Sequence, residues 1–258
     1  MNRVKLGKLA PRHDARTLRL AKYTAALQPP PESCDLTSKI TSLGLMLNDQ
    51  LGDCTCAAIG HIIQAWTAED GAQVILPDPD ILAAYSGACG YVPGNPATDQ
   101  GGVELDVLNY WRKVGVGGHT IDAYAALQKR PANFWGKLFG ASWRHDIATA
   151  VYYFGAAYIG VALPNTAQDA ASWQLVSKRG DGAPGSWGGH AVPILAYDED
   201  GVTVATWGTL MKASWEFIDE YADEAFCCFA KDIVGPDGKS PQGFASTQLE
   251  TDLNEVTA

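Results

Sequence analysis

The chain has 258 residues, of which 47% are hydrophobic and 19% are charged, so it can bury a substantial core and is too apolar for a disordered protein. Its 19 basic and 29 acidic side chains give a formal net charge of −10, which repels phosphate backbones and anionic membranes. We therefore expect no nucleic-acid partner and no membrane partner. No stretch approaches the roughly 18 uncharged apolar residues that a membrane span needs.

Residues 1–45 predict an extended N-terminal arm that lies along the surface without a core of its own. The run Pro29–Pro31 falls within it, and no helical or strand periodicity is sustained. Its first part is basic although the whole chain is acidic, through Arg3, Lys5, Lys8, Arg12, Arg16, Arg19 and Lys22. Such a segment favours solvation or docking on a protein partner over nucleic-acid binding.

The arm also lacks the apolar segment of a secretory signal, which predicts a protein made in the cytoplasm. The six cysteines stand at positions 34, 54, 56, 89, 227 and 228. This spacing is not that of a small secreted disulfide framework, so we expect mostly reduced thiols.

Apolar residues at three- and four-residue intervals predict helices in the first half of the chain. One begins after Asp53, a candidate N-cap, and a second lies near 80–86. A third covers 103–113, beyond the glycine-rich loop GACGYVPGNPATDQGG, and a fourth covers 145–154.

The second half of the chain predicts mainly strands. YIGVAL has the composition of a buried strand, HAVPILAY and GVTVATWG form neighbours joined by a turn at 198–201, and 225–230 forms a further strand. We therefore expect an α+β protein with an arm at 1–45, a helical lobe at 46–125, a β lobe at 126–233 and a loosely held polar tail at 234–258.

The segment NDQLGDCTCAA places Cys54 in the first turn of a predicted helix. There the helix dipole and unsatisfied N–H groups stabilise a thiolate, and the same N–H groups can hold an oxyanion. Acyl transfer through a thiolate needs this arrangement and a nearby base. A buried core thiol is the alternative interpretation.

Of the five histidines, His190 has the context of a base, because it follows Trp187-Gly188-Gly189 and begins an apolar strand. His61 lies seven residues after Cys54, about 10 Å along the helix, which is too far for a direct hydrogen bond. A metal site at Cys54 and Cys56 is disfavoured because structural zinc sites space their cysteines differently. We expect no metal and no cofactor.

Read in order, four segments resemble the papain-like cysteine peptidases, over most of the chain from about Asn48 to Ala230. The segments GDCT and DQGG are similar to the family's Gly-Ser-Cys-Trp and Cys-Asn-Gly-Gly. HDIATAVYYFGAAYIGVAL resembles its next helix and strand, and GGHAVPILAYDEDGVTVATWGT resembles the His-Ala-Val and Asn-Ser-Trp-Gly-Thr strands. More narrowly, Asn-Asp-x-x-Gly-Asp-Cys resembles a group of uncharacterised bacterial and phage-encoded relatives.

The resemblance implies a two-lobed fold with a helical N-terminal lobe, a C-terminal lobe built on an antiparallel β-sheet or barrel, and a cleft between them. It implies Cys54 as the nucleophile and His190 as the base. It also implies that the cleft binds an extended peptide along Gly101, Gly102, Gly189 and Trp207.

Two departures from the family pattern bear on function. The Asn that orients the imidazole is replaced by Ala205 or by Thr206, depending on whether the count starts from the tryptophan or from the histidine. The oxyanion Gln position is Asn48 if Cys54 is the nucleophile, and Gln50 if Cys56 is. We expect Cys54, with Cys56 as the alternative, and a Thr206 hydroxyl could contact the ring where an alanine could not.

Two functions follow from these residues. The first is a thiol hydrolase that cleaves peptide or isopeptide bonds of a peptide or protein substrate through a Cys54–His190 dyad. The second is a non-catalytic papain-like structural or binding protein, such as a phage or prophage virion component, that docks on an assembly through the arm. The missing Asn favours the second function, and the location is then the virion.

Overall fold

The first half of the chain is helical, as its apolar periodicity predicts. The protein is described by a computed structural model for residues 4–131, 141–230, 251–252 and 254–255. A short helix, α1, lies in the arm, and the longer helices follow it. Their bounds are Ala21–Thr24 for α1, Cys54–Glu69 for α2, Asp78–Cys89 for α3 and Glu104–Lys113 for α4.

The second half begins with helix α6 (Arg144–Phe154) and is mainly β-structure, which confirms the predicted α+β class. Its expected strands are present as β5 (Ala157–Leu163), β6 (Gly188–Tyr197), β7 (Gly201–Thr206) and β9 (Ala222–Phe229). The sequence did not predict β8 (Thr209–Ser214) or helix α7 (Trp215–Tyr221), which lie between β7 and β9. Strand β8 is half exposed, so it lacks the apolar run of a buried strand.

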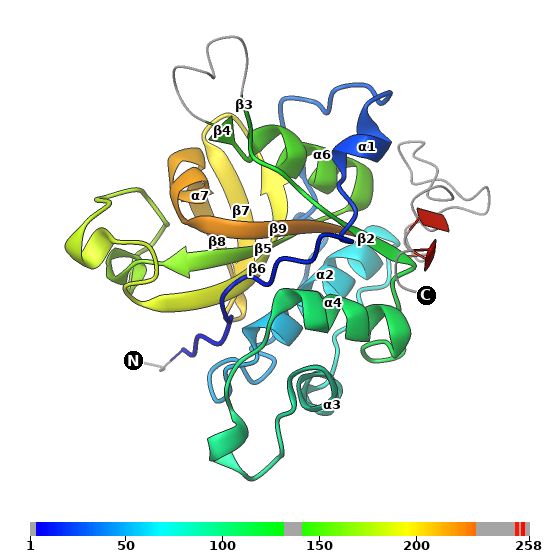
Figure 1. Ribbon diagram of the computed structural model, residues 1–258, viewed down its shortest axis with the longest axis vertical. Helices are drawn as coiled ribbons and strands as arrows, with labels where there is room; N and C mark the ends of the chain where they lie inside the picture. Colours follow the sequence, from blue (N-terminus) through cyan, green and yellow to red (C-terminus); the bar gives the residue numbers. More distant parts are fainter. Residues whose placement is uncertain (1–3, 132–140, 231–250, 253, 256–258) are drawn as a thin grey trace.

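The strands form one antiparallel sheet in the order β2-β9-β5-β6-β7-β8 (Figure 1). Strand β2 (Ala123–Ala126) is one edge, and the short β1 (Cys34–Asp35) pairs with β6. A separate pair joins β3 (Arg130–Pro131) to β4 (Ala141–Ser142). In the register of β5 with β6, Val161 lies opposite His190, which places the histidine near one end of the central strands.

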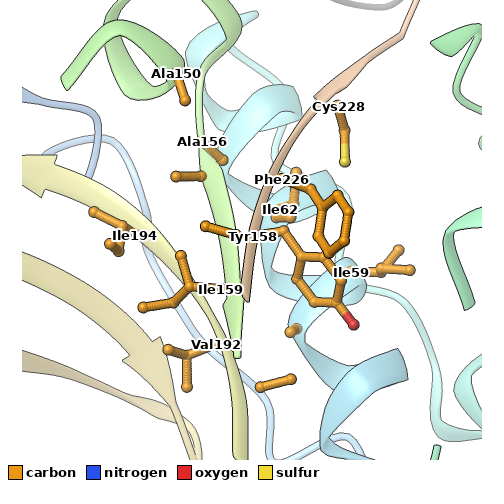
Figure 2. Packing of buried hydrophobic residues seen from close by; sticks show 14 of the residues in the cluster. Ile59, Ile62, Ala150, Ala156, Tyr158, Ile159, Val192, Ile194, Phe226 and Cys228 are labelled. Carbon is orange, nitrogen blue, oxygen red and sulfur yellow. The ribbon is translucent and has the colours of Figure 1, made fainter. Parts of the chain in front are cut away.

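Helix α2 packs against β6, and this contact is the centre of the core. Figure 2 shows Ile59 and Ile62 of α2 beside Tyr158 of β5 and Phe226 of β9. Nearly all of α2 is buried, so the helix that begins with Cys54 cannot shift without disturbing the whole core. On its far side Trp66 stacks on Trp111 of α4 with ring centroids 5.5 Å apart.

The arm does not simply lie along the surface, and in this respect the expectation was wrong. Residues 4–9 are extended, but they cross the molecule between the helices and the sheet (Figure 1). Lys8 is only 6% exposed, and Leu20, farther along, belongs to the hydrophobic core. A lysine enters the interior here because acidic side chains receive it, and that part of the arrangement is not visible in the arm's own sequence.

The predicted tail falls largely on residues 231–250, which lie outside the described part of the chain. Near its end, Asp252 accepts hydrogen bonds from Lys22 and from the Tyr23 hydroxyl. The boundaries expected for the arm, the two lobes and the tail stay predictions. Strand β2 lies across the expected boundary between the lobes, and it pairs with β9 in the sheet. Across the described residues, no helix is long and apolar enough to cross a membrane.

Candidate active site

Cys54 is the first residue of α2, and its side chain is buried. The loop before it is fixed by Asp99, whose Oδ1 accepts hydrogen bonds from the Gly52 N–H at 2.9 Å and from the Tyr85 hydroxyl at 2.7 Å. Asp53 occupies the N-cap position, but its side chain does not cap the helix. The first-turn N–H groups of α2 are therefore not taken up by the Asp53 carboxylate.

His190 lies on β6 between a threonine and a tryptophan. Its Nε2 is 2.8 Å from the Thr206 Oγ1, and its ring stacks on Trp207 at a centroid distance of 4.4 Å. Among the described residues, Nδ1 has no hydrogen-bond partner, so no hydrogen bond joins it to Cys54. Thr206, not Ala205, thus contacts the imidazole.

Cys54 is nevertheless close to the backbone of the strand that carries His190. The backbone N–H of Ala191, the residue after His190, faces the Cys54 thiol, as does the N–H of Gly7 from the arm. Burial raises the pKa of Cys54 to about 12, against the opposing effect of these two N–H groups. Burial also lowers the pKa of His190 to about 3, with a smaller contribution from His61. Both groups are therefore neutral at pH 7.

The arm covers this centre with its own backbone. Gly7 accepts a hydrogen bond from the Gly102 N–H at 2.8 Å, and the Leu9 N–H donates to the Gly102 carbonyl at 2.9 Å, so that arm and loop run parallel. On the other side the Lys8 N–H donates to the Gly189 carbonyl at 3.1 Å. The indole N–H of Trp207 donates to the Lys5 carbonyl at 3.3 Å.

Close approach of the backbones explains why glycines line this passage. A Cβ at Gly101 would overlap the Gly7 carbonyl, and one at Gly189 would overlap the Lys8 carbonyl. Gly101 also has φ +79°, which L-residues rarely adopt. The structure thus brings Gly101, Gly102, Gly189 and Trp207 together around one extended segment, which is the chain's own.

The candidate oxyanion residues are placed differently. Asn48 is buried, and its Nδ2 donates to the Leu51 carbonyl and to Asp53 Oδ1, both at 3.2 Å. Both amide hydrogens are occupied in this arrangement, while Gln50 is exposed. Cys56 is fully buried in the core, and contact with Cys89 together with burial raises its pKa well above the ordinary value.

Sequence reasoning missed an acidic cluster beside the centre, made of Glu104, Asp223 and Glu224. It receives the Lys8 side chain, whose Nζ lies 3.0 Å from each of the last two carboxylates. Two acidic residues side by side in an otherwise apolar strand were the available signal. Within the described residues, no group of three or more His, Cys, Asp or Glu side chains is arranged to hold a metal ion, and all six thiols are free.

Comparison with known proteins finds similarity in structure alone, since no family model and no curated protein sequence matches the chain. Xylellain, a cysteine protease from Xylella fastidiosa, superimposes with a TM-score of 0.63 over 88% of this chain and 97% of its own, at 15% identity. Procathepsin B from Trypanosoma congolense gives 0.55 over 89% of this chain and 87% of its own, at 12% identity. The bromelain protease from Ananas comosus, in complex with the E64 inhibitor, gives 0.51 over 78% and 99%, at 14% identity.

These likenesses cover most of the chain and most of each neighbour. At such low identity they establish the fold, and the mixture of helices with one antiparallel sheet agrees with it. The chain therefore has the papain-like fold of the cysteine proteases, in a form whose sequence has diverged widely from the solved structures that it resembles.

Proposed function

We propose that the protein is a thiol hydrolase of peptide or isopeptide bonds, with Cys54 as the nucleophile and His190 as the general base and acid. The observation that carries this proposal is the arrangement around one extended peptide segment. A cysteine begins a buried helix, the backbone N–H of the residue after the histidine faces its thiol, and Thr206 contacts Nε2 of the imidazole.

The bond between His190 and Thr206 is compatible with the catalytic tautomer. If Nε2 carries the proton and donates it to the Thr206 Oγ1, the lone pair lies on Nδ1, which is the nitrogen left without a partner in the described structure. Thr206 then acts as the positioning residue that the Asn supplies in the family.

The chemistry uses this lone pair twice. Nδ1 takes the proton of the Cys54 thiol as the sulfur attacks the carbonyl carbon, and it returns that proton to the leaving amine when the C–N bond breaks. Water then hydrolyses the resulting thioester and regenerates the thiol. The Cys54 backbone N–H is one oxyanion donor, and Asn48 becomes the second if its amide leaves Leu51 or Asp53.

The arm accounts for the neutral state of Cys54 and His190. Residues 5–9 occupy the passage along Gly102, Gly189 and Trp207, and they exclude water from the thiol. A dry environment disfavours the thiolate–imidazolium pair, so the covered site is a resting state. Activity then requires displacement of the arm by substrate or by a change in the arm itself.

The test compares two cysteines of the same helix in the full-length protein. Cys54→Ala should abolish the release of peptides from a denatured protein substrate, followed by mass spectrometry, since no thiol then faces the cleft. Cys56→Ala, the matched control, removes a core thiol and should leave cleavage within about threefold, at a stability cost of about 1–2 kcal/mol. Cleavage that survives Cys54→Ala would eliminate this mechanism.

A second function, a non-catalytic papain-like binding or structural protein such as a virion component, is favoured by one specific observation. The Asn48 amide is fully engaged with Leu51 and Asp53, so the second oxyanion donor is not ready. Because residues 5–9 lie in the cleft, docking on an assembly would use the later part of the arm. Co-purification with assembled particles, together with an absence of turnover in a variant with an uncovered thiol, would support this alternative.

A further inference from the structure

The Lys8 side chain fills a pocket beside the candidate catalytic centre. The pocket is formed by Glu104, Asp223 and Glu224, and the Asp223 side chain in it is 30% exposed. The Lys8 side chain is 1% exposed, and Nζ also donates to the Leu9 carbonyl at 3.1 Å. Lysine is among the residues least often buried, and it enters an interior only where it is paired. The pocket therefore has features that receive an ammonium group.

The walls of the pocket are shaped to the aliphatic part of a long side chain. A Cβ at Gly160 of β5 would overlap the Cε of Lys8, and Cδ lies next in line. Glycine at this position opens a channel that an alanine would close. The aliphatic part of Lys8 therefore passes directly over Gly160, and it ends at the carboxyl groups.

The carboxyl groups at the end of the channel outnumber the one ammonium group that they receive. One ammonium meets Asp223 and Glu224 at 3.0 Å, and Glu104 adds a third carboxyl group within electrostatic range. Glu104 is completely buried, and neither of its carboxyl oxygens has a hydrogen-bond partner within the described residues. Without a cation, the buried Glu224 carboxyl group would lose its ion pair, whereas Asp223, which is 30% exposed, would still reach solvent.

The pocket also has a defined position along the cleft. The N–H of Gly7 faces the Cys54 thiol, and Lys8 is its direct neighbour in the chain. A peptide lying in the same passage would therefore present to the pocket the side chain adjacent to the residue over the sulfur. This holds for either chain direction.

We propose that the pocket of Glu104, Asp223 and Glu224 is a substrate subsite that selects a lysine or arginine side chain next to the residue over Cys54, and that Lys8 occupies it in the covered state. This inference rests on the proposed function, since it names the substrate class of that site. A neutral side chain in the channel would leave buried carboxyl groups unpaired, and sites built for a polar partner reject analogues that lack it.

The first experiment uses the arm as the ligand and needs no catalysis. The rate of Cys54 alkylation by iodoacetamide, located by peptide mass spectrometry, reports how often the arm leaves the cleft. Lys8→Met keeps the length and loses the charge, and it should raise this rate at least about tenfold, whereas Lys8→Arg should change it less than Lys8→Met does. Lys5→Met is the matched control, because Lys5 is 47% exposed and its ion pair with Asp99 should contribute less than about threefold. Equal rates for wild type and Lys8→Met would overturn the proposal.

The second experiment tests the substrate directly in a full-length Gly7→Ala/Cys54→Ala protein. A Cβ at position 7 overlaps the Gly52 carbonyl, so the arm is displaced while the alanine at 54 prevents turnover. Fluorescent peptides with Gly-Lys or Lys-Gly should bind at least about tenfold more tightly than the same peptides with norleucine in place of lysine. Glu224→Gln should reduce this ratio, and Glu216→Gln on the exposed face of α7 should not.

The outcomes separate this inference from the proposed function. Equal affinities for lysine and norleucine peptides would overturn the pocket's role and leave Lys8 as an anchor of the arm. In another outcome, the Gly7→Ala protein, which retains Cys54, binds lysine peptides selectively and yet does not cleave them. That result would instead refute the proposed hydrolase and leave the pocket as a peptide-binding site. If Gly7→Ala fails to fold, the Lys8 series decides the question alone.

Discussion

Two neighbouring sites under the arm respond to burial in opposite ways. At the centre, Cys54 and His190 are both buried, and burial drives each to its neutral form. In the adjacent pocket, burial also acts to lower the pKa of Lys8, but the nearby carboxylates outweigh it and raise that pKa above 10.5. The difference is one of partners, because His190 and Cys54 face hydrogen-bonding groups while Lys8 faces charges.

The contrast shows how one segment can control the site. In the function that we propose, the ion pairs of Lys8 hold the arm in place, and the backbone of Gly7 beside it keeps water from the thiol. A resting pair of neutral groups is therefore a property of the covered state. Variants that uncover the centre, or that change one site without the other, should reveal whether the two are coupled in this way.

The largest effect is expected for Gly7→Ala in the otherwise unaltered protein. Its Cβ overlaps the backbone oxygen of Gly52, which a side-chain movement cannot relieve, so the segment must leave the passage. The pKa of Cys54 should then fall from about 12 toward an ordinary thiol value or below it, because water and the first-turn N–H groups stabilise the thiolate. At pH 8 the rate of alkylation by iodoacetamide should rise about 100-fold or more.

Gly44→Ala is the matched control, since its Cβ would meet nothing closer than Met46 at 3.8 Å. That variant should keep the wild-type rate and pH profile. The coupling of arm and thiol would be refuted by a Gly7→Ala protein whose Cys54 stays as unreactive as in wild type.

Much of the fold could be predicted from the sequence because its signals are local. The apolar spacing after Asp53 predicted α2, and the apolar run that begins at His190 predicted β6. Strand β8 was missed because its burial depends on neighbours that are distant in sequence. Helix α7 did carry a local signal, since Ser214 caps it and Trp215, Ile218 and Tyr221 are buried at three-residue spacing, and it was missed nonetheless. For β8, only Ala213 is buried, so no periodic apolar pattern marks the strand.

The arm and its pocket could not be predicted for a different reason. Lys8 is one of seven basic residues in the first 22, and composition alone predicts that all seven side chains are exposed to solvent. Its partners Glu104 and Glu224 are about 100 and 200 residues away, so only the folded chain brings the charges together. Likewise, the sequence could not decide whether Ala205 or Thr206 contacts the imidazole. Counting from the tryptophan and counting from the histidine gave different residues, and only the folded structure shows that Thr206 makes the contact.

A smaller effect, confined to the centre, is expected for Thr206→Val. The substitution keeps the shape of the side chain and removes the hydroxyl 2.8 Å from His190 Nε2, which leaves a buried ring nitrogen without a partner. Unfolding in urea should show a loss of about 1–3 kcal/mol. The ¹⁵N chemical shifts of His190 should show loss of the single tautomer, a change that a purely structural role would not produce. Thr203→Val on the same strand should leave the tautomer unchanged, and a preserved tautomer in Thr206→Val would remove Thr206 as the positioning residue.

The smallest effect, confined to the pocket, concerns Glu104→Gln and its dependence on pH. Burial, with the negative charge of Glu224 as a lesser cause, raises the pKa of Glu104 well above 4.5, so the folded protein holds this proton at pH values where the unfolded chain releases it. The stability associated with that proton is present below about pH 4.5 and is lost as the pH rises through the folded pKa. Relative to Glu104→Gln, wild type should therefore lose stability as the pH is raised from 5 toward 8. Urea unfolding of both proteins across this range measures the difference, with Glu216→Gln as a surface control. A difference that stays constant with pH would mean that Glu104 is ionised throughout, and that the pocket already holds all three negative charges around Lys8.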